Sequence, residues 1–383
     1  MLIKFKRRAS FLWNRSPSET TRLQPFPGLF PFDIICLIIK FCDPRERRAL
    51  SLTCRAYHAQ ASKLVWRRIA ITNTRKVDAI GALLRASSLI RQNPACAKHV
   101  QRLDVELQRT KKPHLRLHSK AKVRLALDEL CRALESLPSL RTLYIRMEKW
   151  HDELAHLLSS NATRFPFHLT SFGSSMYITD GLGGFLTSQT TIKTFFRLPK
   201  ASSGRFGDHI PRGSMDIKHG ALPALRQIWT HPDALIESTR GRPLHWIGSP
   251  IASPRHVAAL LGAIQVSSAK VRHVSVCICA TLRDVYESLL TSLANIDSLS
   301  TITLSLWGVD SKVDGVLVFQ RQVTAVLRQI SNFPALRKME VGGSDPAFLT
   351  INPTAFCPRT MKVVEVYDYS GASGKRFRRR KAG

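Results

Sequence analysis

Residues 137–147 read LPSLRTLYIRM, and this phrase decides how most of the chain is interpreted. Its apolar residues at 140, 143 and 145 follow the pattern apolar-x-x-apolar-x-apolar, and the last two alternate as in a strand with one buried face. The phrases LPALRQI at 222–228 and FPALRKM at 333–339 have the same form. Recurrence of one phrase at intervals of tens of residues predicts a chain built from similar structural units.

Runs of this form predict nine strands. They are VQRLDVEL (100–107), LRTLYIRM (140–147), LTSFGS (169–174), IKTFF (192–196), LRQIW (225–229), VRHVSVCI (271–278), LSTITLSL (299–306), LRKMEV (336–341) and MKVVEV (361–366). We take one apolar residue of each run as a register mark: Leu103, Leu143, Phe172, Phe195, Ile228, Val274, Ile302, Met339 and Val364. The intervals between the marks are 40, 29, 23, 33, 46, 28, 37 and 25 residues, which is quasi-periodic.

Helices are predicted between these strands. Apolar residues at steps of four and three indicate helices at 123–134, 255–266, 283–295 and 319–330. Residues 200–220 and the proline-rich 231–254 are predicted to be loops. Alternating short strands and helices favour an α/β fold with a parallel sheet.

The uneven interval with leucine at fixed offsets resembles a leucine-rich-repeat solenoid, although the usual Asn after the strand is missing. The alternative is a non-repetitive α/β domain whose strands merely look alike. In a solenoid, loops such as the basic segment 109–124 gather on one rim and can form a binding face. Side chains between the buried strand positions are then expected to face a target: Tyr144, Arg146, Trp229 and Lys338.

The most apolar stretch of the chain is FDIICLIIKFC at 32–42. It is far shorter than the ~18–20 residues that span a bilayer, yet it is apolar on nearly every side of a helix. Pro31 suits a helix start and Asp43-Pro44 marks its end, which predicts a helix of roughly ten residues. Residues 31–70 then form two or three short helices that leave isoleucines exposed, and such a patch normally marks an interaction site.

The same region resembles an F-box. The resemblance is carried by Phe30-Pro31-Phe32-Asp33-Ile34-Ile35, Ile38, Asp43-Pro44, Leu50-Ser51-Leu52-Thr53-Cys54-Arg55 and Trp66. The departures are Phe30 for the usual Leu, Asp33 for Glu, Cys42 for Leu and Tyr57 for Trp. The resemblance implies binding to the Skp adaptor of a cullin–RING ubiquitin ligase. The residues that it assigns to this interface are Phe30, Pro31, Ile34, Ile35, Ile38, Leu50, Leu52, Cys54 and Trp66. The alternative is an ordinary helical hairpin packed wholly against the rest of the chain.

Charge is the unusual feature of the composition. The 383 residues carry a formal charge of +31, with 58 Lys and Arg against 27 Asp and Glu. Residues 1–22 contribute +5 and residues 371–383 contribute +6, so +20 remains on residues 23–370. This excess favours an acidic partner protein or nucleic acid. Residues at the C-terminal end read as a nuclear localisation signal or a solubilising end: Lys375, Arg376, Arg378, Arg379, Arg380 and Lys381.

Signals for catalysis are weak. His151 and His156 lie five residues apart, so they diverge around a helix and do not form a zinc-protease motif. Cys277 and Cys279 share one strand face, which suits burial better than metal binding. The eight cysteines form no CxxC pair or disulfide framework, which indicates a reducing compartment. We therefore expect no catalytic residue, cofactor or metal, and no membrane-spanning helix. The Arg-rich N-terminus is also compatible with a mitochondrial transit peptide.

The sequence predicts four segments: a basic tail at 1–22, an F-box-like helical module at 23–70, a leucine-rich-repeat-like α/β solenoid at 71–370 and a basic tail at 371–383. The leading hypothesis is a non-catalytic substrate-recognition subunit of a Skp–cullin–F-box ubiquitin ligase, cytoplasmic or nuclear. Its partners would be the Skp-type adaptor, the cullin scaffold and an unidentified target protein; an acidic target is compatible with the charge, and nucleic acid is a less favoured partner. The alternative is a basic nuclear protein that binds nucleic acid or chromatin and has no ligase role.

Overall fold

The computed structural model describes residues 32–53, 55–72, 78–107, 120–147, 150–176, 180–197, 220–279, 283–307, 333, 336–343, 363–368 and 373–378. The chain divides into two compact units. The first comprises residues 1–105 and 110–140, and the second comprises residues 106–109 and 141–383. Each unit is described by itself.

Three short helices begin the first unit: α1 (Phe32–Phe41), α2 (Pro44–Ser51) and α3 (Arg55–Trp66). The Asp43 carboxylate accepts hydrogen bonds from the N–H groups of Arg45 and Glu46, and the Glu46 carboxylate accepts one from the N–H of Asp43. This reciprocal cap satisfies the free N–H groups at the start of α2 and ends α1 where Asp43-Pro44 predicts. The ten-residue helix and the helices after it are therefore confirmed.

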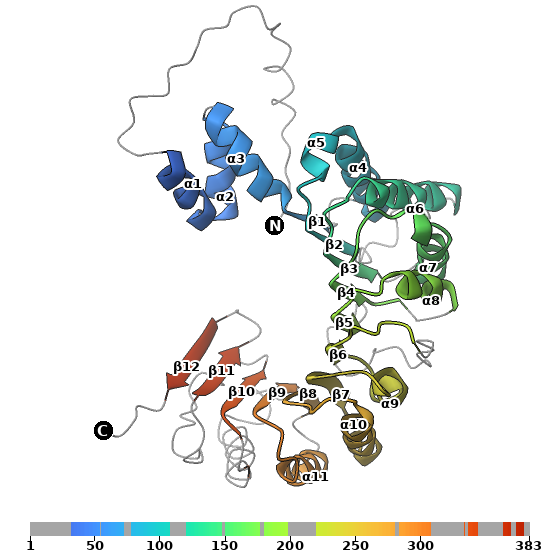
Figure 1. The fold of residues 1–383 in the computed structure, drawn as a ribbon, viewed down its shortest axis with the longest axis vertical. Helices are drawn as coiled ribbons and strands as arrows, with labels where there is room; N and C mark the ends of the chain where they lie inside the picture. Colours follow the sequence, from blue (N-terminus) through green and yellow to red (C-terminus); the bar gives the residue numbers. More distant parts are fainter. Residues whose placement is uncertain are drawn as a thin grey trace, which may run out of the picture. The chain divides into compact units, whose positions relative to one another are not determined.

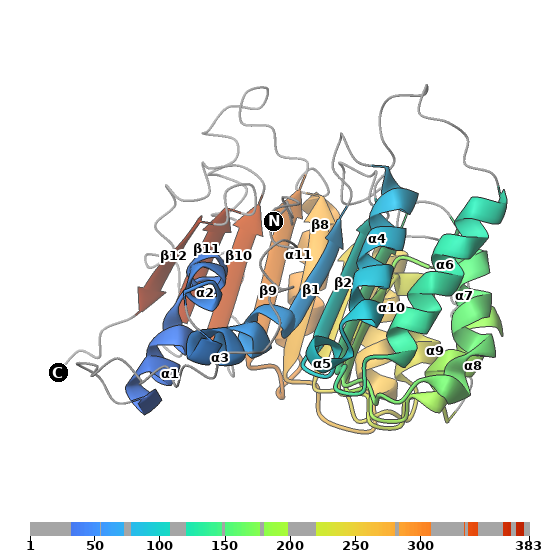
Figure 2. The same cartoon turned by 90° about the horizontal axis from the view of Figure 1, so that it is seen from above.

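The first unit continues with α/β structure: β1 (Arg68–Thr72), α4 (Ala79–Gln92), α5 (Pro94–Ala97), β2 (Arg102–Leu107), whose last two residues belong to the second unit, and α6 (Lys120–Glu135). Helices α4 and α6 lie side by side (Figure 2). Strand β2 and helix α6 were predicted, whereas β1 was not, and the predicted boundary at residue 70 falls inside β1. Of the basic segment 109–124, only residues 120–124 lie within the described chain, where they begin α6.

The second unit alternates strands and helices along the chain. Its elements are β3 (Thr142–Met147), α7 (His151–Ser160), η2 (Ala162–Arg164), β4 (Ser171–Ser174), α8 (Asp180–Ser188), β5 (Thr194–Arg197), β6 (Gln227–Trp229), η3 (Pro232–Ala234), α9 (Leu235–Thr239), β7 (Trp246–Ile251), α10 (Pro254–Val266), β8 (His273–Cys279), α11 (Arg283–Ala294), β9 (Thr301–Trp307), β10 (Lys338–Gly343), β11 (Val363–Asp368) and β12 (Ser373–Arg378). The helices at 255–266 and 283–295 are confirmed as α10 and α11. The helix predicted at 319–330 lies outside the described residues.

The ten strands of this unit form one sheet in chain order, parallel from β3 to β11. The register marks fall opposite one another across the sheet. Leu143 pairs with Phe172, Phe172 with Phe195 and Phe195 with Ile228. Val274, Ile302, Met339 and Val364 continue the same row. All nine predicted strands are present, so the parallel α/β sheet is confirmed.

The prediction of a loop at 231–254 is wrong. This segment contains η3, α9 and β7, and Ile247 of β7 lies in the row between Ile228 and Val274. The 46-residue interval is thus two intervals, of 19 and 27 residues. The prolines misled the prediction. Pro232 and Pro254 start helical turns, and Pro250 lies beyond the last residue of β7 that pairs with β6.

Two apolar rows build the core of this unit. The first is the register row, in which every described side chain from Leu143 to Met339 is at most 1% exposed. The second row lies three residues before each mark: Leu140, Leu169, Ile192, Leu225, Leu244, Val271, Leu299 and Leu336. Helices α7 to α11 cover one face of the sheet, and no described helix of this unit covers the other face (Figures 1 and 2). We call this helix-free side the open face.

The C-terminal end differs from the expected tail. Residues 373–378 form β12, which pairs antiparallel with β11 and places Lys375 opposite Val366 and Arg376 opposite Glu365. The alternation of apolar residues that predicts a strand is absent from this segment, so its sequence gave no strand signal. Strand β12 depends instead on the backbone groups that β11 offers at the edge of the sheet.

Two adjacent phenylalanines of β5 test which face is the core. Phe195 is 1% exposed in the register row, whereas Phe196 is half-buried on the open face. Phe195→Ala should lower the free energy of unfolding by about 3–5 kcal/mol because it leaves a cavity, and Phe196→Ala should cost less than about 2 kcal/mol. Urea unfolding followed by circular dichroism measures both values. Equal costs would contradict this assignment of the faces.

Candidate functional sites

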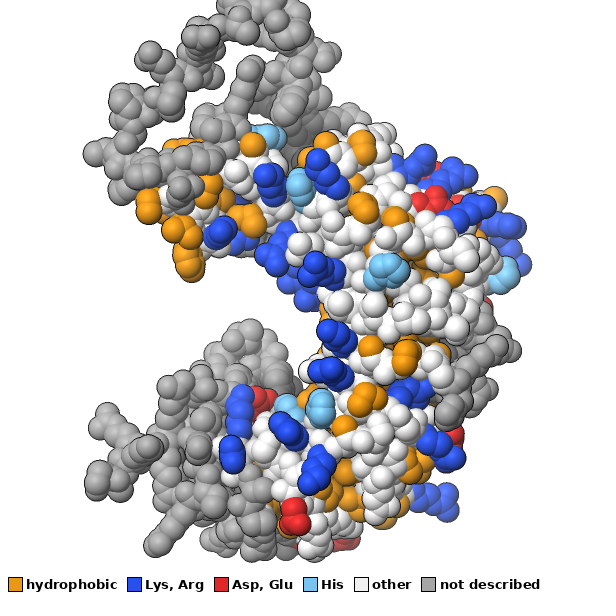
Figure 3. Space-filling model, in the orientation of Figure 1, with side chains coloured by type: hydrophobic (Ala, Val, Ile, Leu, Met, Phe, Trp, Pro, Cys, Tyr) orange, Lys and Arg blue, Asp and Glu red, His pale blue; other side chains and the backbone are white. Residues whose placement is uncertain are grey.

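Helix α1 exposes an apolar stripe. Ile34 is 40% exposed, Leu37 46%, Ile38 47% and Phe41 88%, and Ile39 on another side of the helix is 1% exposed. The exposed residues are spaced three, four and seven positions from Ile34, so they share one helical face. We call them the α1 stripe, and they form part of an apolar group on the surface at this end of the first unit (Figure 3).

Polar contacts behind the stripe hold α1 in place. Arg47 of α2 donates hydrogen bonds to the carbonyls of Ile39 and Lys40, at 3.0 and 2.6 Å. These carbonyls belong to the last turn of α1, which has no helical partners for them, and a cation is favourable at this end of a helix. Backbone N–H bonds from Glu46 and Arg45 lower the pKa of the Asp43 carboxyl, so the cap between α1 and α2 stays ionised at neutral pH.

The predicted adaptor-binding residues fall into three groups. Ile34, Ile38 and Leu52 are exposed, and Leu52 is 83% exposed. Leu50 and Trp66 are half-buried. Phe30, Pro31 and Cys54 lie outside the described residues, and for Ile35 only the backbone is described.

Sequence reasoning missed two residues of the α1 stripe. Leu37 and Phe41 were not assigned to the adaptor surface, although they are as exposed as the residues that were. The signal was present, since both share the helical face of Ile34 and Ile38. The family pattern directed attention to its own positions rather than to this periodicity.

The open face of the second unit carries a continuous group of aromatic rings. The ring centroids of Tyr144 and Phe196 are 6.2 Å apart, and those of Phe196 and Trp246 are 5.7 Å apart. Trp246 also contacts Trp229 at 6.1 Å and the His273 ring at 5.7 Å. These five half-buried side chains come from β3, β5, β6, β7 and β8, and we call them the aromatic stripe.

Two glycines make room for these rings. A Cβ atom on Gly173 would lie 2.2 Å from Cδ1 of Tyr144, and one on Gly248 would lie 2.2 Å from Cε3 of Trp229. Each ring therefore lies across the neighbouring strand at a position that only glycine leaves empty. Because these two positions have no side chain, the rings of Tyr144 and Trp229 can lie against the backbone of the neighbouring strand.

A polar chain continues the open face from β8 to β10. His273 Nε2 lies 2.9 Å from Thr303 Oγ1, and the Thr303 hydroxyl donates to Glu340 Oε2 at 2.9 Å. Because that hydroxyl uses its hydrogen toward Glu340, Nε2 of His273 carries the proton and donates. Lys338 forms an ion pair with Glu340. Burial lowers the pKa of His273 to about 4, against the opposing effect of the Glu340 carboxylate, so the imidazole is neutral at physiological pH.

The predicted target-binding residues all lie on strands of this face. Tyr144 and Trp229 belong to the aromatic stripe, and Lys338 ends the polar chain. Arg146 forms an ion pair with Glu106 at 3.3 Å. Sequence reasoning missed Phe196, Trp246 and His273. Phe196 directly follows a register mark, as Trp229 does, so the sequence pattern placed it on the same face. Trp246 lies on β7, in the segment that was predicted to be a loop.

The predicted localisation residues are only partly described. Lys375, Arg376 and Arg378 lie within the bounds of β12, and Arg379, Arg380 and Lys381 lie outside the described residues. Their role as a signal stays a prediction.

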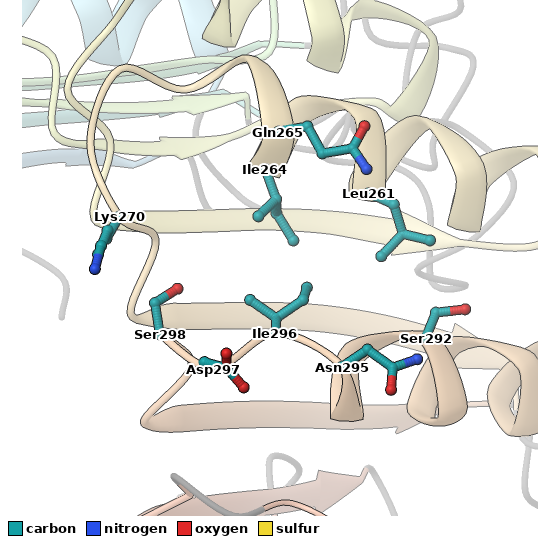
Figure 4. Close-up of a pocket in the computed structure, with 9 residues that line it drawn as sticks. All are labelled: Leu261, Ile264, Gln265, Lys270, Ser292, Asn295, Ile296, Asp297 and Ser298. Atoms are coloured by element: carbon teal, nitrogen blue, oxygen red, sulfur yellow. The ribbon is translucent and has the colours of Figure 1, made fainter.

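A surface pocket lies between α10, α11 and the turn before β9 (Figure 4). Its volume is about 650 Å³, and Ile264 and Ile296 line its centre with Lys270 and Asp297 at one end. Its polar lining consists of Gln265, Lys270, Ser292, Asn295, Asp297 and Ser298. The pocket is a gap between neighbouring helical layers.

Comparison with known proteins identifies one region. Residues 29–67 match the family model of the F-box domain. No curated protein matches the sequence. The leucine-rich-repeat resemblance is not confirmed by any family match. F-box proteins are typically non-catalytic adaptors, and an F-box suggests a role in substrate recognition by a Skp–cullin–F-box ubiquitin ligase, through a Skp-type adaptor. No helix of the described chain is long and apolar enough to cross a membrane.

Substitution of Gly248 tests the packing of the aromatic stripe. The Cβ of Gly248→Ala would lie 2.2 Å from the Trp229 ring and 2.9 Å from the Trp246 ring. The rings must move, so we expect a loss of about 1–3 kcal/mol in the free energy of unfolding and a changed tryptophan emission spectrum. Gly183→Ala in α8 is the control, because its Cβ would meet no atom within 4 Å. A neutral Gly248→Ala would refute the close ring contact.

The neutral His273 predicts a pH dependence. Its pKa is lowered from 6.5 to about 4, so between these values the unfolded chain binds a proton that the folded chain does not. The free energy of unfolding should therefore fall as the pH is lowered from about 6.5 to about 4. His273→Gln should flatten this slope, whereas His245→Gln, at an exposed position, should keep it. Thermal unfolding across this pH range measures the slopes, and an unchanged slope in His273→Gln would contradict the prediction.

Proposed function

We propose that this protein is a substrate-recognition subunit of a Skp–cullin–F-box ubiquitin ligase. The observation that carries the proposal is the α1 stripe, an exposed apolar helix face inside the region that matches the F-box domain. A soluble surface rarely exposes such a contiguous apolar group without a partner. Covering a fully exposed side chain of this size contributes about 1.5–3 kcal/mol, and Ile34, Leu37 and Ile38, which are 40–47% exposed, contribute less each.

The adaptor interface extends beyond the α1 stripe in this proposal. Leu52 adds an exposed apolar side chain, and Leu50 and Trp66 support the helices from partly buried positions. Phe30, Pro31, Ile35 and Cys54 are included from the resemblance to the F-box. The cullin scaffold is joined through the adaptor and needs no surface of this chain.

The second unit holds the target. We interpret it as a leucine-rich-repeat-like solenoid because its strands pair in one register and each is preceded by a buried apolar residue at the same offset. Tyr144, Arg146, Trp229 and Lys338 then contribute to a target-binding face. The predicted boundaries at residues 22, 70 and 370 remain proposals, as does a cytoplasmic or nuclear location.

The mechanism is proximity. The chain performs no bond chemistry in this proposal. It holds the target beside the ligase, so that a reaction between two molecules becomes a reaction within one complex. Rate enhancement then depends on how long and in which orientation the target is held.

A second candidate function is nucleic-acid or chromatin binding without a ligase role. The charge of +31 favours it, because long basic surfaces bind phosphate backbones without sequence preference. The two candidates differ in their dependence on salt. Binding to phosphates weakens steeply as salt rises, whereas capture of an adaptor by an apolar helix face survives moderate salt.

Loss of the α1 stripe tests the proposed function. We expect Ile38→Asp combined with Phe41→Asp to reduce recovery of the Skp-type adaptor at least tenfold in co-purification, because both side chains are exposed and the changes place charge in an apolar interface. The control is Leu125→Asp, which places one such charge at a 52%-exposed leucine of α6, away from the α1 stripe. If the folded wild-type protein recovers no adaptor in moderate salt, the ligase proposal fails.

A further inference from the structure

Basic side chains form a row along one end of the parallel strands in the second unit. The residue directly before each strand is Arg141 for β3, Lys193 for β5, Arg226 for β6, Arg272 for β8 and Arg337 for β10. His245 precedes β7 at the same position. All six side chains are exposed, and Lys and Arg side chains recur along this unit in Figure 3. We call the four arginines and the lysine the basic row.

The backbone fixes the spacing of this row. The carbonyl of Arg141 accepts hydrogen bonds from the N–H groups of Thr170 and Ser171, at 2.8 and 3.0 Å. Six further carbonyls likewise accept a pair of hydrogen bonds from two consecutive N–H groups: those of Thr170, Lys193, Arg226, His245, Arg272 and Ser300. Neighbouring strands lie ~4.8 Å apart, so the charges follow one another at roughly 5–10 Å over a length of roughly 30 Å.

No described residue neutralises the basic row. The ion pairs of the described chain engage other cations, such as Arg146 with Glu106 and Lys338 with Glu340. Exposed like charges repel one another and destabilise the fold slightly, so their alignment has no structural benefit of its own. A line of uncompensated cations fits a line of anions.

Along the chain, residues of the row lie close to residues of the aromatic stripe. Arg226 is three residues before Trp229, His245 directly precedes Trp246, and Arg272 directly precedes His273. Strands β3, β5, β6 and β8 thus each follow a residue of the basic row and carry a ring of the aromatic stripe one to three residues later. The surface combines positive charges with apolar rings, so its ligand should combine negative charges with apolar side chains.

We propose that the basic row and the aromatic stripe together bind an extended acidic segment of a target protein, whose carboxylates pair with the row and whose apolar side chains cover the rings. The proposal deepens the proposed function, because it assigns a chemistry to the target. A segment of roughly ten residues at ~3.3 Å each spans the row. Side chains of an extended segment point alternately to two sides, so acidic and apolar residues can meet the two parts of the surface at once.

The rings favour a peptide over a nucleic acid. Single-stranded nucleic acids use separate aromatic platforms on which successive bases stack. Here the rings contact one another: Trp229 and Trp246 are stacked at an interplanar angle of 29°, whereas the other three pairs of the stripe lie at 53°, 68° and 84°. The stripe is a joined apolar surface.

The test uses the full chain and four fluorescent probes in low salt, read by anisotropy. The probes are a peptide of repeated Glu-Phe-Asp-Gly, its basic counterpart Lys-Phe-Lys-Gly, its aromatic-free counterpart Glu-Ala-Asp-Gly, and single-stranded oligothymidylate of similar length. The wild type should bind the first peptide best. Arg226→Glu combined with Arg272→Glu should weaken that binding about tenfold.

The control separates the row from net charge. Arg164→Glu combined with Arg255→Glu changes the charge equally at exposed positions of η2 and α10, outside the row, and should weaken binding less than about twofold. Equal weakening by both double variants, or no binding of the first peptide by the wild type, overturns the proposal. Tighter binding of oligothymidylate that is lost in the row variant overturns it in favour of nucleic acid.

Recovery of the Skp-type adaptor is measured on the same samples. The row variant should recover as much adaptor as the wild type, because none of its changes lies on α1. The two proposals therefore fail separately: loss of peptide binding by the wild type leaves adaptor capture intact, and loss of adaptor capture leaves peptide binding intact.

Discussion

The fold of the second unit depends on one repeated backbone interaction. The carbonyl before a strand accepts two N–H bonds from the start of the next strand, and this occurs seven times between Arg141 and Ser300. A parallel strand that slipped by one residue would turn its apolar side chains to the wrong face. This pair of hydrogen bonds fixes the register of each strand, and the register decides which side chains are buried. Burial of the row from Leu143 to Met339 then supplies the stabilisation.

The properties of the open face follow from the same register. Once the marks point toward the helices, the residues on either side of each mark must point away from them. Aromatic side chains at these positions meet across strands, and glycine at Gly173 and Gly248 lets two of the rings lie on the neighbouring strand. The positions before the strands are likewise aligned, so basic residues there become a row. The high charge of the chain is therefore partly an ordered feature of one surface rather than a general property.

Much of this architecture could be read from the sequence, because local patterns encode it. Nine strands were predicted from apolar spacing alone, and the Asp43-Pro44 stop correctly ended α1. The prediction failed where local signals were overridden. Strand β7 was missed because Pro250 suggested a loop. Strand β12 has no alternation of apolar residues and forms by pairing with β11. The ring contacts could not be predicted, since Tyr144 and Gly173 meet only after two strands pair across 29 residues.

The two proposed surfaces rest on different physics, and this difference has a functional consequence. The α1 stripe binds by removing apolar surface from water, which moderate salt does not weaken. The basic row binds by charge, which is screened over ~8 Å at physiological ionic strength. If both proposals hold, adaptor binding would depend little on salt, whereas target binding would depend on the charge of the target. On the proposed surface, a modification that adds negative charge to an apolar segment of a target would add anions for the basic row to pair with, without any change in the chain itself.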